Sequence, residues 1–144
     1  MNPLSQRVAE GAEGRGDFPH RAITESIIGA AIKVQRSLGP GLFESAYEAC
    51  LIHELQQSGH TVATQVPIDI QYGELQVTGA YRLDIVVDDA VIVELKTVEK
   101  LLDIHRAQVN SYLRFSGKTV GLLLNFWAWP LKDGGIERIV RTRA

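Results

Sequence analysis

Two short apolar runs separated by three residues constrain the fold of this chain most, because together they predict a β-hairpin. The runs are Leu83–Val87 and Val91–Leu95. Their length is typical of strands in a buried sheet. Three charged residues, Asp84, Glu94 and Lys96, lie inside these runs or directly after them, where a strand favours β-branched and aromatic side chains. The charges therefore require an explanation besides folding.

A hairpin of this form would place two carboxylates opposite each other. If residues 88–90 form the loop, Val87 faces Val91 and Asp84 faces Glu94, because side chains alternate between the faces of a strand. One face would then be entirely apolar or aromatic, formed by Tyr81, Leu83, Ile85, Val87, Val91, Val93 and Leu95. A one-residue slip would undo the Asp84–Glu94 opposition but would leave Glu94 and Lys96 on a shared face.

Opposed carboxylates at this place have two explanations. Like charges directly across a strand pair are destabilising, and the usual remedy is a divalent cation or a raised carboxylate pKa. Two hard oxygen ligands with a nearby backbone carbonyl suit Mg²⁺, and Lys96 beside them could orient or help deprotonate an attacking water. The other explanation is an exposed face on which Glu94 and Lys96 are solvated and Arg82 neutralises Asp84.

The chain of 144 residues is long enough for one domain with a single core. Residues 1–20 contain few large apolar side chains, which predicts a flexible N-terminal arm, and residues 21–144 would form the single domain. The order of elements indicates an α/β sheet with helices packed on it. Periodicity, capping residues and turn signals predict a helix from the N-cap Thr24 to Leu38, a helix over residues 42–58, strands over 61–70 and 75–81, the hairpin, a helix over 101–115, a fully buried strand over 119–126 and a last, peripheral strand over 136–140.

Charge and composition exclude some classes of function. The formal net charge is −2, with 15 basic and 17 acidic residues, so any polyanion binding would need a local patch. The one basic cluster is Arg138, Arg141 and Arg143, expected as solvated charges and as candidates for phosphate contact. A single Cys50 excludes an internal disulfide and reads as a small core residue. Without an 18-residue apolar run or a signal-like stretch, the expected location is the cytoplasm, with no membrane association.

Two of the expected helices carry polar residues in candidate positions. Glu44 lies in the first turn of its helix, where a carboxylate favours the positive end of the dipole, yet it shares a stripe with Tyr47, which should face the sheet. Gln108 and Tyr112 are four residues apart and share one face, with His105 one turn earlier. From the residues alone, Glu44 could either cap its helix or point inward as a site residue. The stripe that contains Gln108 and Tyr112 could either face solvent or border the site.

The hairpin also resembles a known motif. LDIVVDDAVIVELK is similar to the core motif of the PD-(D/E)XK nuclease superfamily, with Asp84, Glu94 and Lys96 at its three positions. The resemblance implies a restriction-endonuclease-like fold, which is an α/β fold with a mixed central sheet flanked by helices. It also implies hydrolysis of phosphodiester bonds of nucleic acid with Mg²⁺ or Mn²⁺ as cofactor, and DNA is expected over RNA.

Three further segments narrow the resemblance to one branch. LGPGLFESAYEACLIHEL resembles the signature of the GxxExxY family, a small branch of that superfamily, with Gly41, Glu44 and Tyr47 in the named positions. HRAQVNSYL and GLLLNF also match the usual pattern of that family. The resemblance extends over roughly residues 22–142.

The chain departs from that family pattern in two places. Gln35 stands where the family commonly has His. The link WAWPLKDGG before the last strand is unusual and adds Trp127 and Trp129. These indoles could stack on bases, although capping of the sheet edge is the simpler expectation.

The resemblance assigns roles to particular residues. Asp84 and Glu94, with the backbone carbonyl of Leu95, would hold the metal, and Glu44 would assist directly or through water. Lys96 would position the nucleophile. The catalytic set is then Asp84, Glu94, Lys96 and Glu44, and the residues expected to contact substrate or support the site are Gln108, Tyr112, His105 and Tyr47.

Two functions from different classes fit these features. The first is a metal-dependent nuclease. The second is a catalytically inactive nuclease-fold module that binds another molecule, which the small size and acidic balance also fit. Either function is compatible with a homodimer or with a protein partner. Hydrolysis of a different substrate by Asp84 and Glu94 as an acid/base pair is disfavoured, because Lys96 would hold both carboxylates ionised.

Overall fold

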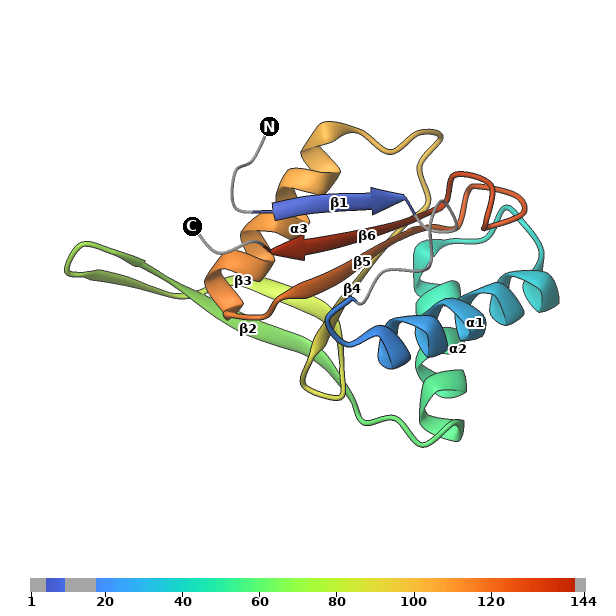
Figure 1. The fold of residues 1–144 in the computed structure, drawn as a ribbon, viewed down its shortest axis with the longest axis horizontal. Coiled ribbons are helices and arrows are strands. Elements are labelled where there is room, and N and C mark those ends of the chain that lie inside the picture. Colours follow the sequence, from blue (N-terminus) through green and yellow to red (C-terminus); the bar gives the residue numbers. More distant parts are fainter. Residues whose placement is uncertain (1–4, 10–17, 142–144) are drawn as a thin grey trace.

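The computed structural model of the protein describes residues 5–9, by their backbone alone, and residues 18–141. Within these residues six strands form one sheet in the order β1-β6-β5-β4-β3-β2, and three helices pack on it (Figure 1). β4 and β5 are parallel, and the other neighbouring pairs are antiparallel. The fold is therefore α/β with a mixed sheet flanked by helices, as the sequence predicted. The elements are β1 (Ser5–Ala9), α1 (Arg21–Leu38), α2 (Glu44–Gln57), β2 (Val62–Tyr72), β3 (Leu75–Val87), β4 (Val91–Lys96), α3 (Asp103–Ser116), β5 (Val120–Asn125) and β6 (Ile136–Arg141).

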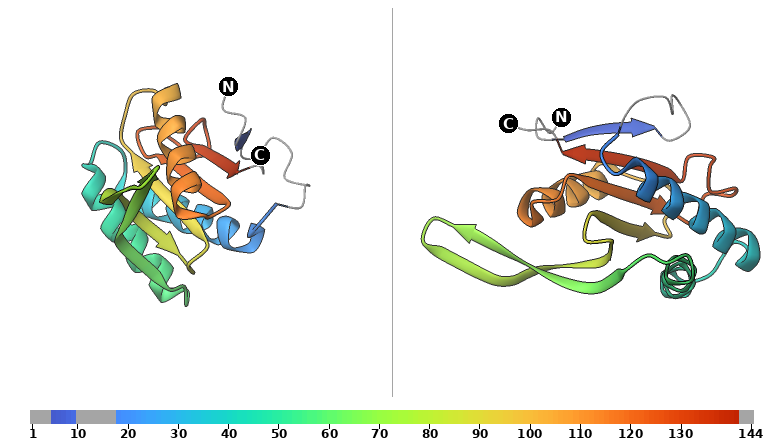
Figure 2. Two further views of the ribbon diagram at one scale, coloured as in Figure 1. Left: turned by 90° about the vertical axis from the view of Figure 1, so that its left-hand side faces the viewer. Right: turned by 60° about the horizontal axis from the view of Figure 1, so that its bottom comes forward.

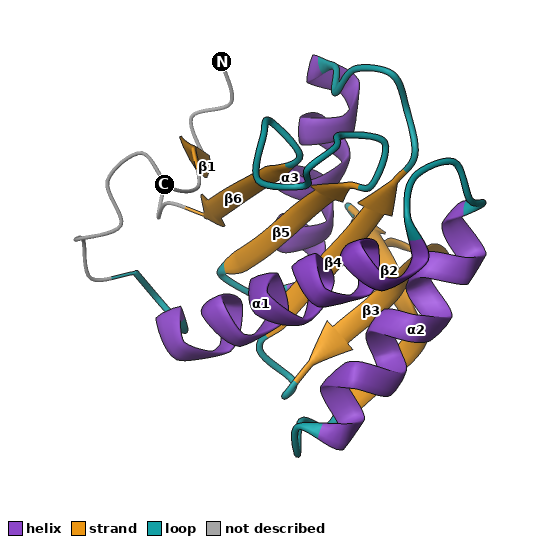
Figure 3. Ribbon diagram, turned by 90° about the vertical axis from the view of Figure 1, so that its right-hand side faces the viewer, coloured by secondary structure: helices purple, strands orange, loops and turns teal. Residues whose placement is uncertain are grey.

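The helices form two layers, with α1 and α2 on one face of the sheet and α3 on the other (Figure 3). Ile27 of α1 and Leu51 of α2 belong to one core, which includes Val93 of β4. Val109 of α3 belongs to a second core with Ile92 of β4. Consecutive β4 residues thus enter opposite cores, and the sheet is buried on both faces at its centre.

The central strands β4 and β5 are the most buried part of the molecule. Residues 91–95 of β4 and all of β5 are buried, which confirms the fully buried strand predicted for residues 119–126. Their parallel register runs from Val91 opposite Val120 to Lys96 opposite Asn125. Both strands therefore end at the same edge of the sheet, and the segments that follow them are neighbours in space (Figure 3).

The two strands predicted over residues 75–81 and 83–87 are one long strand, β3, and it forms an extended arm with β2. The register between β2 and β3 shifts between Ile68 and Ile70. The carboxylate of Asp69 spans the shift, since its Oδ1 accepts a hydrogen bond from the Gly79 backbone (2.8 Å) and its Oδ2 one from Gln76 (3.0 Å). Beyond this point the arm projects away from the helices (Figures 1 and 2), with Tyr72 78 % exposed at its end.

The N-terminal half of α1 corrects two expectations. The helix begins at Arg21, with His20 before it in the left-handed region, and not at Thr24. Thr24 is a buried helical residue whose hydroxyl accepts a hydrogen bond from Arg138 Nη2 (2.7 Å). Arg138, expected as a solvated charge, is buried, and its guanidinium also lies over the ring of Phe18 at 4.4 Å from the ring centroid. It ties β6 to α1 and does not present a phosphate contact. Arg143 lies outside the described residues.

The N-terminal arm and the last strand also differ from expectation. Ser5–Ala9, expected within a flexible arm over residues 1–20, form β1 and pair antiparallel with β6. Pairing with an edge strand satisfies backbone groups without requiring large apolar side chains. β6, expected as peripheral, consequently lies between β5 and β1.

Three side chains, Ser26, His60 and Asp88, connect α1 to the α2–β2 connection and to the β3–β4 turn. Ser26 Oγ lies 2.7 Å from His60 Nε2, and His60 Nδ1 lies 2.6 Å from Asp88 Oδ2. Asp88 Oδ1 accepts a hydrogen bond from the Thr61 backbone (2.9 Å). These contacts hold the β3–β4 turn against the α2–β2 connection, at the opposite edge of the sheet from the ends of β4 and β5. None of the helices within the described ranges is long and apolar enough to cross a membrane.

Candidate active site

The β3–β4 hairpin has the predicted register. Val87 pairs with Val91 and Ile85 with Val93, and the pairing stops there. Asp84 and Glu94 are the next residues along each strand, so they lie where the two strands cease to pair. The predicted register is therefore confirmed, whereas the paired residues end one position before Asp84 and Glu94.

The expectation of one unbroken apolar face on β3 is wrong. Ile85 packs in the core beneath α1 and α2, but Leu83 packs in the core beneath α3. The alternation of faces is interrupted at Asp84. The neighbouring strand is irregular at the same level, because Gln65, between the partners of Leu83 and Ile85, has a φ of +53°. A left-handed residue in one strand changes the local twist of the pair at the level of Asp84.

Glu94 and Lys96 share the face of β4 that carries Ile92, which is the face covered by α3. Glu94 is only 6 % exposed. Its Oε2 lies 3.4 Å from Lys96 Nζ, and both side chains are largely buried. The alternative in which both charges are solvated on an open face is therefore wrong.

The electrostatics of Glu94 show that one lysine does not balance the negative charge around it. The pKa of Glu94 is raised from 4.5 to about 7, mainly by burial and in addition by the nearby Asp84 carboxylate, whereas Lys96 acts in the opposite direction. Glu44 adds a smaller effect in the same direction as Asp84. A buried carboxylate with this pKa is stabilised by any additional positive charge that reaches it.

The backbone of β4 offers a third oxygen at the same place. Lys96 O accepts a hydrogen bond from Phe126 N (2.8 Å), so this carbonyl points toward β5. Successive carbonyls of a strand point in opposite directions. The Leu95 carbonyl consequently points toward β3, beyond Ile85–Val93, where the pairing of the two strands has stopped.

Glu44 begins α2, and burial raises its pKa despite its place in the first turn of the helix. Lys96 lowers this pKa and Asp84 raises it, so Glu44 interacts with the same charges as Glu94. Glu48, one turn later, also has a raised pKa, because of burial, Asp84 and Glu44. Glu48 was not among the predicted site residues. Its spacing of four from Glu44 on one helical stripe was the signal that could have identified it.

Gly41 and Tyr47 shape the turn that presents Glu44. Gly41 has a φ of +90°, which disfavours a side chain. The Tyr47 hydroxyl donates to Gly39 O (2.6 Å) and accepts from Leu42 N (3.2 Å), and its ring stacks on Phe126 with centroids 4.6 Å apart. Tyr47 is buried and its hydroxyl is engaged within the chain, so of the two roles expected for it, the geometry fits support of the site and not substrate contact. Tyr47 positions the connection between α1 and α2.

On α3, Tyr112 lies within electrostatic range of the carboxylates. Burial, together with the negative charges of Glu94 and Asp84, raises its pKa to about 12. Its ring packs edge-on against Tyr81 at 5.4 Å between centroids. Gln108, one turn earlier, has a buried Oε1 without a hydrogen-bond partner. An unsatisfied buried amide oxygen is costly for folding alone, so its partner is expected from outside the chain.

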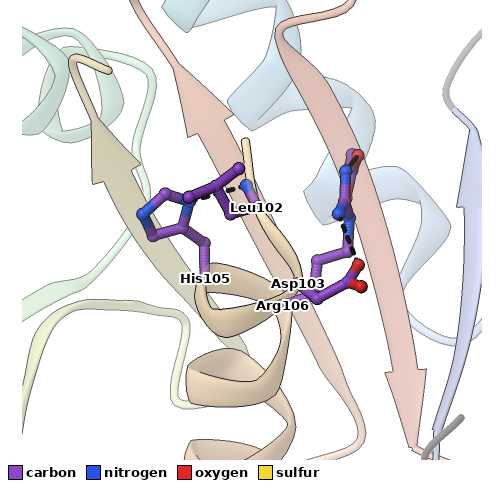
Figure 4. A network of polar contacts seen from close by, with 5 residues as sticks. Leu102, Asp103, His105 and Arg106 are labelled. Carbon is purple, nitrogen blue, oxygen red and sulfur yellow. Dashed lines mark hydrogen bonds and ion pairs between the residues drawn. The ribbon is translucent and has the colours of Figure 1, made fainter. Parts of the chain in front are cut away.

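His105 has a local structural contact. Its Nδ1 accepts a hydrogen bond from Leu102 N (2.9 Å), which caps the first turn of α3 (Figure 4). Arg106 beside it donates to Asp103 (3.0 Å) and, through two nitrogens, to Glu137 of β6 (2.8 Å each). This network fixes the N-terminal end of α3 against the sheet. The phosphate contact expected of His105 stays a prediction.

The donor set fits a hard divalent cation in part. Among residues 18–141, no three side chains of the His, Cys, Asp and Glu types are gathered so as to hold a metal ion. The three-carboxylate set of Glu44, Asp84 and Glu94 is thus not assembled around one point. Two carboxylates, the Leu95 carbonyl and water remain, and Mg²⁺ typically takes one or two carboxylates and keeps several waters. The excess negative charge at Glu94 agrees with such a site.

Two buried polar residues that the sequence did not single out as site residues organise its border. Asn125, opposite Lys96, accepts from Val98 N (3.1 Å) and donates to Val98 O (2.8 Å). It fixes the segment that follows Lys96. Gln35, noted only as a departure from a family pattern, binds the backbone of the β5–β6 connection at three points. Trp127 and Trp129 of that connection are half exposed.

Comparison with known proteins gives one match. The family model described as the PD-(D/E)XK nuclease superfamily matches residues 21–139. This range contains α1 to β5 and most of β6, with every residue of the candidate site. No match was found among curated proteins, and none among solved structures.

Proposed function

The chain belongs to the PD-(D/E)XK nuclease superfamily, and from this premise we propose that it is a metal-dependent nuclease that hydrolyses phosphodiester bonds of nucleic acid, with DNA as the expected substrate. The observation that carries the proposal is Glu94, which is 6 % exposed, has a pKa raised to about 7 and has Lys96 at 3.4 Å. Burial of a carboxylate beside a second carboxylate destabilises the fold unless it serves a purpose such as holding a cation.

In the proposed site, Asp84, Glu94 and the Leu95 carbonyl hold Mg²⁺ or Mn²⁺, and Glu44 assists through water. When bound, such an ion polarises the scissile phosphate and lowers the pKa of a bound water. Because the pKa of Glu94 lies near 7 in the metal-free protein, binding of the ion would release part of a proton at neutral pH. This release gives calorimetry a specific signal, which is a binding enthalpy that depends on the ionisation enthalpy of the buffer.

The other residues act on water and phosphate. The Lys96 ammonium orients the attacking water and stabilises the negative charge that develops on the phosphate oxygens. Tyr112 stays protonated because its pKa is about 12, so its hydroxyl can donate a hydrogen bond to a phosphate or a carboxylate. Gln108 supplies a further polar group at the border of the site. A role for His105 in phosphate contact is part of this proposal.

Within the superfamily we assign the chain to the GxxExxY branch. Support comes from the physical function of the three named positions. Gly41 takes a positive φ, Glu44 starts α2 beside the candidate site, and Tyr47 closes the turn between them through its hydroxyl. The proposed enzyme acts in the cytoplasm, where a single free thiol such as Cys50 stays reduced.

The test is incubation with linear, circular and single-stranded DNA and with RNA, in the presence of Mg²⁺, Mn²⁺ or EDTA. Glu94→Ala and Lys96→Ala are the test variants. Glu99→Gln and Lys100→Ala are matched controls, since both residues are exposed in the segment after β4. Metal-dependent cleavage that persists undiminished in Glu94→Ala and Lys96→Ala would falsify the assignment.

A second candidate function is favoured by one observation, the absence within residues 18–141 of three gathered metal-ligating side chains. It is a nuclease-fold module that has lost catalysis and binds nucleic acid or a protein, as a monomer or a homodimer. Calorimetry with Mg²⁺ and Mn²⁺ separates the two candidates. Binding of either ion that is lost in Glu94→Ala supports the enzyme, and failure of both ions to bind supports the module.

A further inference from the structure

Three aromatic side chains are exposed on the connections that border the candidate site. Phe43 is 85 % exposed, Trp127 53 % and Trp129 51 %. We call these three residues the aromatic rim. Large aromatic side chains gain most from burial, so their exposure on two connections at the same edge of the sheet is a feature that often marks an interaction site.

The aromatic rim is joined to the site through short backbone links. Phe43 directly precedes Glu44, the first residue of α2. Trp127 donates its backbone N–H to Asn125 Oδ1 (3.3 Å), and Asn125 is the register partner of Lys96. The α1–α2 connection and the β5–β6 connection both lie at the edge of the sheet where β4 ends (Figure 3). A strand whose phosphate reached Lys96 would therefore pass close to the rim.

The connection that carries the two tryptophans is fastened to the core, so it presents them in a fixed place. Gln35 Nε2 donates to Phe126 O (3.1 Å) and Ala128 O (2.5 Å), and its Oε1 accepts from Leu131 N (2.7 Å). Gln35, Phe126 and Leu131 are buried. Since Phe126 and Leu131 fill the core here, the indoles of Trp127 and Trp129 are not needed for packing. A rigid backbone with exposed rings is a preorganised contact surface.

Electrostatics argue that a nucleic-acid ligand must be held partly by contacts other than phosphate contacts. The net charge is −2, and Arg138 of the basic C-terminal cluster is buried against Thr24. A protein that forms few phosphate contacts releases few counterions from nucleic acid on binding, and so gains little of the free energy on which most nucleic-acid affinity depends. Stacking of bases on aromatic rings is the common non-electrostatic source of affinity, and it requires bases that are not paired.

We propose that Trp127, Trp129 and Phe43 stack on unpaired bases, and that the substrate of this protein is nucleic acid with a single-stranded segment at the cleavage site. The proposal rests on the nuclease function proposed above and names its substrate class. In a duplex the faces of the bases are stacked on each other and are closed to the rim, so double-stranded nucleic acid binds weakly unless its strands separate.

Binding of labelled oligothymidylate, of a blunt duplex and of an abasic strand of equal length, measured by fluorescence anisotropy in EDTA, tests the proposal. The single strand should bind at least tenfold more tightly than the duplex or the abasic strand. Trp127→Ala and Trp129→Ala should each weaken oligothymidylate binding by about 5- to 100-fold, and Phe43→Ala should weaken it in the same direction. Tyr72→Ala is the control, because Tyr72 is 78 % exposed on the β2–β3 arm, and it should bind like the wild type.

A second readout separates this proposal from the nuclease function. Cleavage of the same oligonucleotides in Mn²⁺ is measured for the wild type, Glu94→Ala and the two tryptophan variants. Equal affinity for single strand and duplex, or unchanged binding in both tryptophan variants, overturns the substrate class whether or not cleavage occurs. Tryptophan-dependent binding without cleavage by any variant supports the rim and refutes the nuclease. A rim that binds no oligonucleotide but retains a protein partner also overturns the proposal.

Discussion

Glu94 and Lys96 lie on the same face of β4, with Glu94 Oε2 3.4 Å from Lys96 Nζ, and both side chains are largely buried. Burial, together with the negative charge of Asp84 and, to a smaller extent, of Glu44, raises the pKa of Glu94 to about 7 although Lys96 lowers it, so the pair does not neutralise its surroundings. An isolated buried ion pair of this kind contributes little to stability. We therefore interpret the Glu94–Lys96 pair as part of the proposed site for a cation and a phosphate.

Substitution of either residue should reduce or abolish cleavage, but by different routes. Glu94→Gln keeps the shape of the side chain but removes a charge that holds the ion, so both metal binding and cleavage should be lost. Lys96→Ala should leave metal binding in place and lower kcat by about 10²- to 10³-fold, since it removes one stabilising charge from the transition state. Calorimetry and single-turnover kinetics on the two variants check this split. Equal loss of metal affinity in both variants would contradict it.

The raised pKa of Glu94 should appear in the stability of the metal-free protein. The folded state binds the Glu94 proton more tightly than the unfolded state, so this group favours folding below pH 4.5 and its contribution is lost as the pH rises to about 7. A shift from 4.5 to about 7 corresponds to about 3 kcal/mol. Glu94→Gln in EDTA should therefore raise Tm relative to the wild type more at pH 8 than at pH 4.5.

The control for this measurement is the exposed Glu99→Gln, which should show no such difference between the two pH values. In the wild type, Mn²⁺ should raise Tm at pH 8 by mass action, and Glu94→Gln should lose this increase. A Glu94→Gln variant that is destabilised equally at both pH values would show that the carboxylate makes a contact required for folding.

Gln35→Ala should loosen the β5–β6 connection. The substitution leaves Leu131 N and the carbonyls of Phe126 and Ala128 without their present partner, and an unsatisfied buried group costs about 1–3 kcal/mol. Chemical denaturation should show a loss of that order. Gln71→Ala is the matched control, because its amide bonds only the exposed Gly73 carbonyl, and it should lose well under 1 kcal/mol. Hydrogen exchange at residues 126–135 should accelerate in Gln35→Ala alone.

Asp88 should give the protein an acid-sensitive turn. The hydrogen bond with His60 lowers the pKa of Asp88, and the Thr61 backbone lowers it in addition. A depressed carboxylate pKa contributes stability above the unfolded-state value near 4 and loses it as the pH falls through the folded-state value. Asp88→Asn should therefore lower Tm at pH 7 and should narrow its difference from the wild type at pH 3. A constant difference between pH 7 and pH 3 would show that geometry and not charge is responsible.

Local sequence patterns were sufficient where the interactions are local. The three-residue link between two apolar runs gave the correct register of Val87 with Val91, because turn length fixes the pairing of a hairpin. The helix predicted to end at Leu38 does end there, and Gly39 directly after it takes a positive φ. Contacts between residues far apart in the sequence were missed, because local patterns contain no information about them. Thr24 looks like an N-cap in sequence, and only the position of Arg138, more than a hundred residues later, shows why its hydroxyl is buried within a helix.

The sequence by itself determined which residues are candidates for the site, because Asp84, Glu94 and Lys96 stand at fixed spacing on two strands joined by a short turn. Only the tertiary structure decided whether those charges are solvated. α3 covers the face that carries Glu94 and Lys96, and α2 brings Glu44 and Glu48 into range of Asp84. Whether a side chain on a strand is buried depends on the elements that pack on that strand, and not on the sequence of the strand itself. The environment that raises the pKa of Glu94 could therefore not be predicted from the hairpin alone.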